Sequence, residues 1–253
     1  MKEVLCCIGD SLTAGKHSYN WVKDIELFFK KNNINYGVIN KANDGETAAV
    51  VRSRLKKDVI DLNPSVVVVL IGGNDLIGTV HTSAGPMYMK MFPEIQTELP
   101  SIDGYRREMN EIVKILDEDL PLDTKIIILS PPPIGEGGIE SEEWNLGEKF
   151  HEICLESVTN RIGNSDSNRI LYRNLYQIVK DDMIRFDCNQ KLELSLYTIS
   201  KSKILSYFMG WKGVRYINGF DYTTDGIHFC EEFGIICKEL IIQLLYECNI
   251  LED

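Results

Sequence analysis

Short apolar runs alternate along this chain with longer stretches in which apolar residues recur every three or four positions. Two of the runs, "SVVVVLI" (65–71) and "KIIILS" (125–130), are almost entirely aliphatic. Such runs are typical of strands that are covered on both faces of a parallel sheet. Segments 3–8, 36–40 and 169–175 are also predicted to be strands, which gives a sheet of about five strands.

Helical patterns lie between the predicted strands. Segment 47–63 and the segments Met109–Leu116 and Phe233–Leu245 each place apolar residues on one helical stripe. Alternation of strands and helices predicts an α/β fold, with helices on both sides of a parallel sheet in three layers (α/β/α). Two stretches, 76–102 and roughly 179–218, do not fit this alternation.

Composition limits the class of protein. Hydrophobic residues make up 44% and charged residues 26% of the 253 residues, which is typical of a globular chain with a sizeable core. No repeat or shift in composition divides the chain, so one domain over 1–253 is predicted. The formal net charge of −11 predicts repulsion of nucleic acid and of anionic membranes, and nucleic-acid binding is set aside.

Targeting and cysteine patterns indicate a cytoplasmic protein. No apolar run is long enough for a transmembrane segment, and the N-terminal residues do not form a signal-peptide pattern. The cysteines are odd in number and form no C-x-x-C pair, so we expect free buried thiols and neither a disulfide framework nor a zinc site. They are Cys6, Cys7, Cys154, Cys188, Cys230, Cys237 and Cys248.

Polar residues follow the predicted strands. Ser11 comes after the first strand, Gly45 after the second and Asn74 after the third, while Asp225 and His228 precede the last helical pattern. In open parallel sheets, ligands bind at the carboxyl ends of the strands, so we expect these residues to lie along one edge.

These residue types are the ones that acyl transfer requires. A serine hydroxyl is a weak nucleophile until a base such as an imidazole takes its proton, and a carboxylate can orient that imidazole. Asp225, three residues before His228, suits the orienting role. The backbone N–H groups of Ser11 and Gly45 and the side-chain amide of Asn74 are candidate donors to the developing oxyanion. This chemistry needs neither a cofactor nor a metal.

Several blocks of the sequence resemble a known family. "GDSLTAG" (9–15), "NKANDGET" (40–47), "GGND" (72–75) and "DGIH" (225–228) are similar, in order and spacing, to the blocks of the SGNH (GDSL) hydrolases. "LSPPP" (129–133) also stands in the expected place. No G-x-S-x-G elbow surrounds the serine, which argues against an ordinary α/β-hydrolase.

The resemblance implies a flavodoxin-like fold and a lipase-like acylhydrolase that cleaves carboxylic esters through an acyl-serine intermediate. Carried over by position, Ser11 is the nucleophile, His228 the base and Asp225 the residue that orients it. Gly45 and Asn74 complete the oxyanion hole. The expected partner is a small ester, with short acyl groups such as acetyl favoured. Acyl transfer to an alcohol, thioesterase or lysophospholipase activity and carbohydrate deacetylation stay open as alternatives, as does a catalytically silent binding module.

The irregular stretches suggest parts of a substrate pocket. One hypothesis is that apolar residues after the third strand line an acyl pocket, because methionine adapts to irregular apolar shapes. The alternative is a loop packed on the rim of the sheet. The candidates are Met87, Tyr88, Met89, Met91 and Phe92. Segment 204–211, in the second stretch, is a candidate to cover the site.

Other residues near these motifs are given plainer roles. Asp10 and Asp75 are predicted to accept backbone hydrogen bonds that hold their loops. His17 and His81 are near the site motifs in the sequence, so a place beside the site stays open, but a surface position without a functional role is favoured for both. "GEGG" (135–138) is interpreted as a loop, since no Lys-Ser or Lys-Thr follows it to make a phosphate-binding loop.

Overall fold

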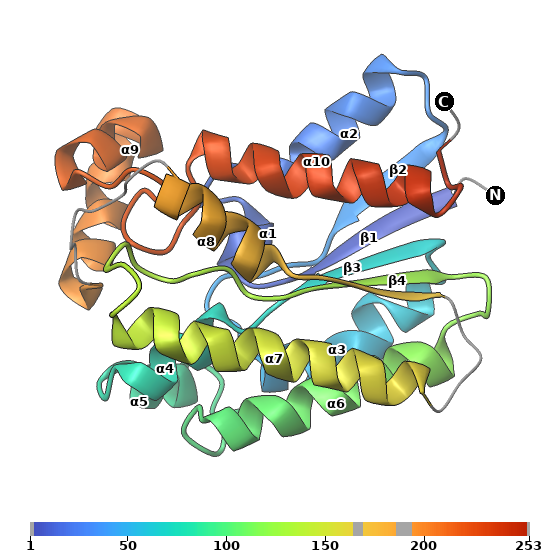
Figure 1. The fold of residues 1–253 in the computed structure, drawn as a ribbon, viewed down its shortest axis with the longest axis horizontal. Helices are drawn as coiled ribbons and strands as arrows, with labels where there is room; N and C mark the ends of the chain where they lie inside the picture. The colour runs from blue at the N-terminus through green and yellow to red at the C-terminus, as the bar shows by residue number, and fades with distance from the viewer. Residues whose placement is uncertain (1–2, 164–168, 186–193, 252–253) are drawn as a thin grey trace.

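A computed structural model describes residues 3–163, 169–185 and 194–251 (Figure 1). At its centre is a five-stranded, fully parallel sheet with the strand order β2-β1-β3-β4-β5. The prediction of a flavodoxin-like parallel sheet is therefore confirmed. The strands are β1 (Glu3–Gly9), β2 (Tyr36–Asn40), β3 (Val66–Leu70), β4 (Lys125–Leu129) and β5 (Ile170–Arg173).

Helices cover both faces of the sheet, as the alternating pattern predicted. Helices α2 and α10 lie on one face, and α3, α6 and α7 lie on the other (Figure 1). Their bounds are α2 (Trp21–Lys31), α3 (Ala48–Asp58), α6 (Ile102–Asp119), α7 (Glu142–Ile162) and α10 (Glu231–Glu247). The remaining elements are α1 (Ser11–Ala14), the 3₁₀ turn η1 (Ile60–Leu62), α4 (Gly73–Val80), α5 (Ala84–Met91), α8 (Leu175–Arg185) and α9 (Leu196–Asn218).

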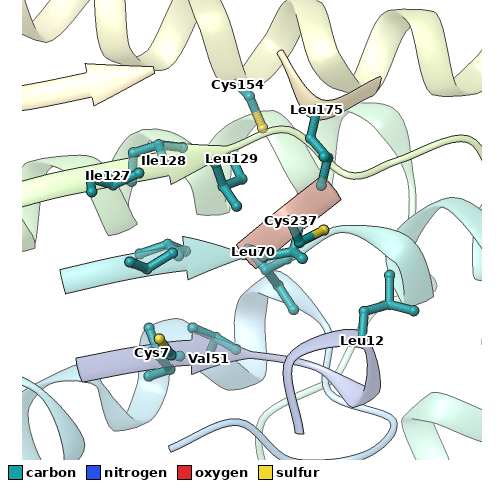
Figure 2. Close-up of a cluster of buried hydrophobic side chains, with 14 of the residues drawn as sticks. Cys7, Leu12, Val51, Leu70, Ile127, Ile128, Leu129, Cys154, Leu175 and Cys237 are labelled. Carbon is teal, nitrogen blue, oxygen red and sulfur yellow. The ribbon is translucent and has the colours of Figure 1, made fainter. Parts of the chain in front are cut away.

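The core lies between the sheet and these helices. Every residue of β3 is buried, as its continuous apolar run predicted. Figure 2 shows Cys7 and Leu70 from the strands together with Val51 of α3, Cys154 of α7 and Cys237 of α10. The cysteines of the described residues are free thiols, and all except Cys248 are buried, whereas Cys188 lies outside the described residues.

The strand order places a switch point at the end of β1. The chain runs from β1 to β2 on one side and then crosses to β3 on the other. Ligands bind in the crevice that such a reversal leaves at the carboxyl ends of the strands. No helix within the described ranges is long and apolar enough to cross a membrane.

The helices were predicted less completely than the strands. The pattern found α3, α6 and α10, but it gave no prediction for α2 and α7. The stretch 76–102 contains most of α4, all of α5 and the beginning of α6, while 179–218 contains most of α8 and all of α9. Helices α5 and α9 gave no clear apolar stripe because they bury few large apolar side chains: α5 buries Tyr88 with two small residues, and α9 buries Ser202 and Val214.

Candidate active site

Ser11 is the first residue of α1 and stands two residues after the end of β1. The Asp10 carboxylate accepts a 3.0 Å hydrogen bond from the Leu12 N–H and caps this short helix, as predicted for a loop-holding residue. The ends of β1 and β3 are also in close contact, since a Cβ added to Gly9 would clash with the carbonyl oxygen of Leu70. The Asp10 cap and the close contact between β1 and β3 therefore hold Ser11 at the carboxyl end of the sheet.

The structure brings Ser11, His228 and Asp225 together. His228 Nε2 lies 3.1 Å from Ser11 Oγ, and His228 Nδ1 lies 2.8 Å from Asp225 Oδ2. Asp225 Oδ1 also accepts hydrogen bonds from the backbone N–H groups of Ile227 and His228. All three side chains are buried. They form a continuous series of contacts from carboxylate through imidazole to hydroxyl.

Opposing effects set the pKa values of this acid–imidazole pair. Burial alone would raise the pKa of Asp225, but the charge of His228 and hydrogen bonds to the carboxylate lower it below its ordinary value. Burial alone would lower the pKa of His228, but the charge and hydrogen bond of Asp225 raise it above its ordinary value of 6.5. Asp225 therefore stays ionised and stabilises a proton on His228.

A buried glutamate, Glu136, holds the loop over 221–229 that carries the acid and the imidazole. Its Oε1 accepts hydrogen bonds from the Tyr222 N–H at 2.9 Å, the Thr223 N–H at 2.7 Å and the Thr223 hydroxyl at 2.8 Å. Its Oε2 accepts one from the Asp221 N–H at 2.8 Å. The loop geometry therefore depends on a residue far away in the sequence.

Sequence reasoning missed this role of Glu136, although it singled out the segment 135–138 as a loop. A second contact joins the same two loops, because the Gly135 N–H donates a 2.7 Å hydrogen bond to the Gly226 carbonyl. One acidic residue between glycines gives no periodic signal. Only its burial, at 1% exposed, distinguishes it from an ordinary loop glutamate.

Gly45 and Asn74 belong to two segments that meet beside the end of β1. The Asn43 N–H donates to the Gly9 carbonyl at 3.2 Å, which holds the loop before Gly45 along β1. Gly45 itself has a φ of +77°, which favours glycine. Asn74 Nδ2 donates a 2.8 Å hydrogen bond to the Glu46 carbonyl and so joins the start of α4 to the same loop. The three candidate donor segments are thus neighbours in space.

The candidate donors have hydrogen-bonding capacity to spare. In the part of the chain that the structure describes, the backbone N–H groups of Ser11 and Gly45 and the second N–H of the Asn74 amide make no hydrogen bond. Asp75 stabilises this region by accepting a 2.9 Å hydrogen bond from the Ala48 N–H at the start of α3, in line with its predicted structural role. Burial raises the pKa of Asp75 to about 7.

The five candidate pocket residues lie in and just after α5, and two of them contact the site. The Tyr88 hydroxyl donates a 2.8 Å hydrogen bond to Asn74 Oδ1, and Tyr88 is buried. The Met91 Cε atom lies 2.5 Å from the position that a Gly45 Cβ would occupy. The other three candidates are an exposed side chain, Met87, and the half-buried Met89 and Phe92.

His17 lies closer to the site than its predicted surface position implied. It is half-buried, with its ring centroid 5.8 Å from that of His228 and 5.3 Å from that of Trp211 in α9. His17 Nε2 is 3.1 Å from Asp44 Oδ2, and burial lowers the pKa of His17. His81 is also half-buried, with Nε2 3.3 Å from a Glu143 carboxylate oxygen.

Trp211 is a further neighbour of the site that the sequence did not single out by itself. Its ring centroid is 6.2 Å from that of His228, so part of α9 does adjoin the site, as segment 204–211 suggested. Trp211 also lines a cavity of about 310 Å³, together with Thr224 and Phe229 from the loop that carries His228. The described residues contain no group of three or more His, Cys, Asp or Glu that could hold a metal ion.

The sequence model of the GDSL-like lipase/acylhydrolase family matches residues 7–157, which is more than half of the chain. The chain belongs to this family. It is a carboxylic ester hydrolase of the GDSL (SGNH) type. No curated protein sequence matches it.

Solved structures share the fold of this GDSL hydrolase. The acetylxylan esterase Axe2 from Geobacillus stearothermophilus is 15% identical, with a TM-score of 0.63 over 98% of this chain and 96% of that one. LAE5, an alpha/beta hydrolase enzyme from the metagenome of Lake Arreo in Spain, is 16% identical, with a TM-score of 0.63 over 99% and 97% of the two chains. The similarity extends beyond the family match to nearly the whole chain.

Proposed function

We propose that this GDSL hydrolase is a serine esterase in which Ser11, His228 and Asp225 form the catalytic triad. The observation that carries the proposal is the series of contacts from Asp225 through His228 to Ser11 Oγ. Each contact has the length of a hydrogen bond, and the three side chains come from opposite ends of the sequence. A histidine with a purely structural role would need a hydrogen bond to Asp225 or to Ser11, but not to both.

In the proposed mechanism, Ser11 Oγ attacks the ester carbonyl carbon while His228 Nε2 takes the hydroxyl proton. The bond between the carbonyl carbon and the alcohol oxygen then breaks, and His228 gives its proton to that oxygen. Water next attacks the acyl-serine with His228 again as the base, which releases the acid and restores the Ser11 hydroxyl. Asp225 keeps the proton of the neutral imidazole on Nδ1, so that Nε2 faces the serine.

The oxyanion hole in this proposal consists of the Ser11 N–H, the Gly45 N–H and the Asn74 side-chain amide. Their spare hydrogen-bonding capacity supports the assignment, because a donor that is already in use cannot stabilise new charge. The Tyr88 hydroxyl fixes the orientation of the Asn74 amide, since it donates to Oδ1 and leaves Nδ2 as the donor end. Removal of one such donor typically lowers the rate by about 10²–10³.

The favoured substrates are esters of short acyl groups, such as acetyl esters. The contact of Met91 with Gly45 and of Tyr88 with Asn74 supports this choice, because bulky side chains then lie against both oxyanion donors. The esterases that share the fold support it further, since Axe2 is described as an acetyl-xylooligosaccharide esterase. Of the other candidates, the half-buried Met89 and Phe92 extend this proposed acyl pocket, whereas the exposed Met87 is left outside it.

We also propose that residues 1–253 form one hydrolase domain. The family match ends at residue 157, but β5, Asp225 and His228 lie beyond it. One hydrophobic cluster includes both Leu5 in β1 and Leu245 in α10. The C-terminal part therefore completes the sheet, the core and the proposed triad.

The test is hydrolysis of p-nitrophenyl esters from acetate to longer chains by the wild-type protein and by Ser11→Ala. We expect the highest kcat/KM on acetate and a loss of at least about 10³-fold in the variant, because the nucleophile is removed. A fluorophosphonate probe should label the wild type at Ser11. A folded wild type that neither cleaves any ester nor takes up the probe would contradict the proposal and favour a binding module.

The pocket is tested by Met91→Ala, with Met87→Ala as the matched control. Met91, which is 47% exposed, lies against Gly45, whereas Met87, a methionine of the same helix that is 41% exposed, does not. We expect the preferred acyl chain to lengthen in Met91→Ala and to stay unchanged in Met87→Ala. If neither variant changes the preferred acyl chain length, Met91 does not line the acyl pocket.

A further inference from the structure

Helix α9 differs in charge from the rest of the protein. Its residues Leu196–Asn218 include four lysines and arginines and no acidic residue, although the whole chain carries a net charge of −11. The four cations are Lys201, Lys203, Lys212 and Arg215. The helix consists of two parts that meet at Gly210, where φ is 66° and ψ is 172°. This segment is therefore positively charged, although the chain as a whole is negatively charged.

Large apolar side chains are exposed along α9. Tyr207 is 87% exposed, Phe208 is 84% exposed and Tyr216 is 89% exposed. Aromatic side chains of this size normally bury most of their surface, and a contiguous exposed group of them marks an interaction surface. The full set is Tyr197, Ile204, Tyr207, Phe208, Met209, Tyr216 and Ile217.

The exposed residues before Gly210 form a stripe on one face of the helix. Tyr197, Lys201, Ile204 and Phe208 follow one another at steps of four, three and four residues, which places them in line. The buried Ser202 lies on the opposite face. The stripe thus combines aromatic and aliphatic groups with a lysine, and it faces solvent.

Two of the four cations are available to a partner. Lys212 and Arg215 pair with glutamates at the start of α10, so their charges are already compensated. Among the described residues, neither Lys201 nor Lys203 forms an ion pair. Lys201 lies within the apolar stripe, whereas Lys203 lies on another side of the same part of the helix, where its positive charge opposes protonation of His17 and His228. Uncompensated positive charge and exposed aromatic surface therefore coincide.

The position of α9 relates this face to the proposed active site. The helix lies at the outer edge of the molecule, on the side where the parallel strands have their carboxyl ends (Figure 1). Trp211, directly after the bend at Gly210, contacts His17 and lies near His228. A surface that receives α9 would consequently lie next to the site at which esters are cleaved.

We propose that the exposed face of α9 docks on an anionic lipid surface. A helix that places Lys and aromatic residues toward solvent is suited to the boundary between headgroups and acyl chains, where lysine reaches the phosphates and the rings enter the interface. Anionic lipid complements the charge of Lys201 within the stripe, and Lys203 adds positive charge beside it, towards His17 and His228. At physiological ionic strength, charges separated by more than about 8 Å are screened, so the acidic body opposes this contact only weakly.

The test is sedimentation of the protein with phosphatidylcholine vesicles that do or do not contain phosphatidylglycerol. Ser11→Ala is used, so that no lipid is hydrolysed during the measurement. We expect binding to the anionic vesicles that weakens as salt is added, and at least about tenfold weaker binding to phosphatidylcholine alone. Absence of binding to phosphatidylglycerol vesicles, or equal binding to both vesicle types, would overturn the proposal.

Two double substitutions, each made in the Ser11→Ala protein, measure separately how much the aromatic residues and the lysines of α9 contribute to vesicle binding. Tyr207→Ser with Phe208→Ser should weaken vesicle binding about tenfold or more by removing the aromatic contact. Lys201→Gln with Lys203→Gln should weaken it by about the same factor and reduce the dependence on salt. The lysine variant keeps the proposal testable if the aromatic variant does not fold.

Matched controls lie on other elements. Leu122→Ser removes an apolar side chain that is 86% exposed between α6 and β4, and Lys56→Gln with Lys57→Gln removes two exposed lysines from α3. Both controls should bind vesicles like the parent. If they lose binding as much as the α9 variants, the contact is unspecific and the proposal fails. It also fails if the α9 substitutions convert a dimer to a monomer in light scattering, because the face would then be a contact between two copies.

The vesicle result is independent of the proposed esterase activity. Tyr197→Ser, made in the wild-type protein, should hydrolyse p-nitrophenyl acetate at the wild-type rate, since Tyr197 belongs to the stripe but lies outside segment 204–211, and this small ester needs no surface. Vesicle binding without any esterase activity in the wild type would contradict the proposed function and support the docking face. Esterase activity without vesicle binding would support the proposed function and contradict the docking face.

Discussion

The two halves of the proposed triad are held in different ways. Ser11 stands two residues after the end of a buried strand, and its position is set by neighbours such as Asp10 and Leu12. Asp225 and His228 stand on a loop, and Glu136, about ninety residues away, holds that loop through four hydrogen bonds. The nucleophile is therefore positioned by local structure, and the acid–base pair is positioned by tertiary structure.

Because of this difference, substitutions of the residues that hold the two halves should have unequal effects. A buried carboxylate that accepts several backbone hydrogen bonds cannot be replaced without leaving donors unpaired, which costs about 1–3 kcal/mol for each such group. A helix-capping aspartate, in contrast, can be replaced by asparagine at little cost, since both residues accept the same hydrogen bond. The loop side should consequently be the more sensitive one.

The largest effect is expected within the loop itself, from Asp225→Asn. An asparagine keeps the shape of the side chain, but its amide N–H₂ opposes the proton on Nδ1 and favours the wrong tautomer of His228. We expect kcat to fall on the order of 10⁴-fold, with KM for p-nitrophenyl acetate changed much less. A fall of less than about tenfold would show that Asp225 does not orient the imidazole.

A smaller but diagnostic effect is expected from Glu136→Gln. The substitution presents an amide N–H₂ to backbone N–H groups that now donate to a carboxylate, so the loop should shift. We expect kcat to fall on the order of 10²-fold, as for a displacement of about 1 Å, and the melting temperature to fall as well.

The matched control for this substitution is Glu140→Gln. Glu140 follows Glu136 by four residues and is exposed, so the same chemical change should leave activity and melting temperature unaltered. Equal effects from the two substitutions would contradict a specific role for Glu136. A lower melting temperature with unchanged kcat would show that the loop can move without moving the imidazole.

The smallest effect is expected on the serine side, from Asp10→Asn. Asparagine still caps α1, so kcat/KM at its optimum should stay within about threefold of the wild type. The informative measurement is the pH profile. His228 must be neutral to take the proton from Ser11, and its pKa lies above 6.5 because of Asp225, so kcat/KM of the wild type should rise with pH with a midpoint above 6.5.

Asp10 also contributes to that midpoint. Burial raises the pKa of Asp10 to about 7, and the ionised carboxylate helps to raise the pKa of His228. Removal of this negative charge in Asp10→Asn should move the acid limb of kcat/KM to lower pH. A shift to higher pH, or a loss of activity as large as that of Glu136→Gln, would reverse the comparison between the two sides.

The sequence indicated most of the fold and the candidate site, because both depend on short-range patterns. Continuous aliphatic runs such as 65–71 predicted buried strands, and the structure has β3 there. The blocks at 9–15 and 225–228 predicted residues that the structure brings within hydrogen-bond distance. Helices α2 and α7 were not predicted, although α2 buries Trp21, Val22, Ile25 and Phe29 on one regular apolar stripe.

The sequence by itself determined which chemical groups stand at the ends of the strands, since strand periodicity and turn residues are local properties of the chain. Only the tertiary structure decided which remote groups complete the site. Glu136, the His17–Trp211 contact and the approach of Met91 to Gly45 each join segments without any spacing rule between them. Burial and unpaired hydrogen-bonding groups are properties of the folded chain, so these roles became visible only with the chain folded.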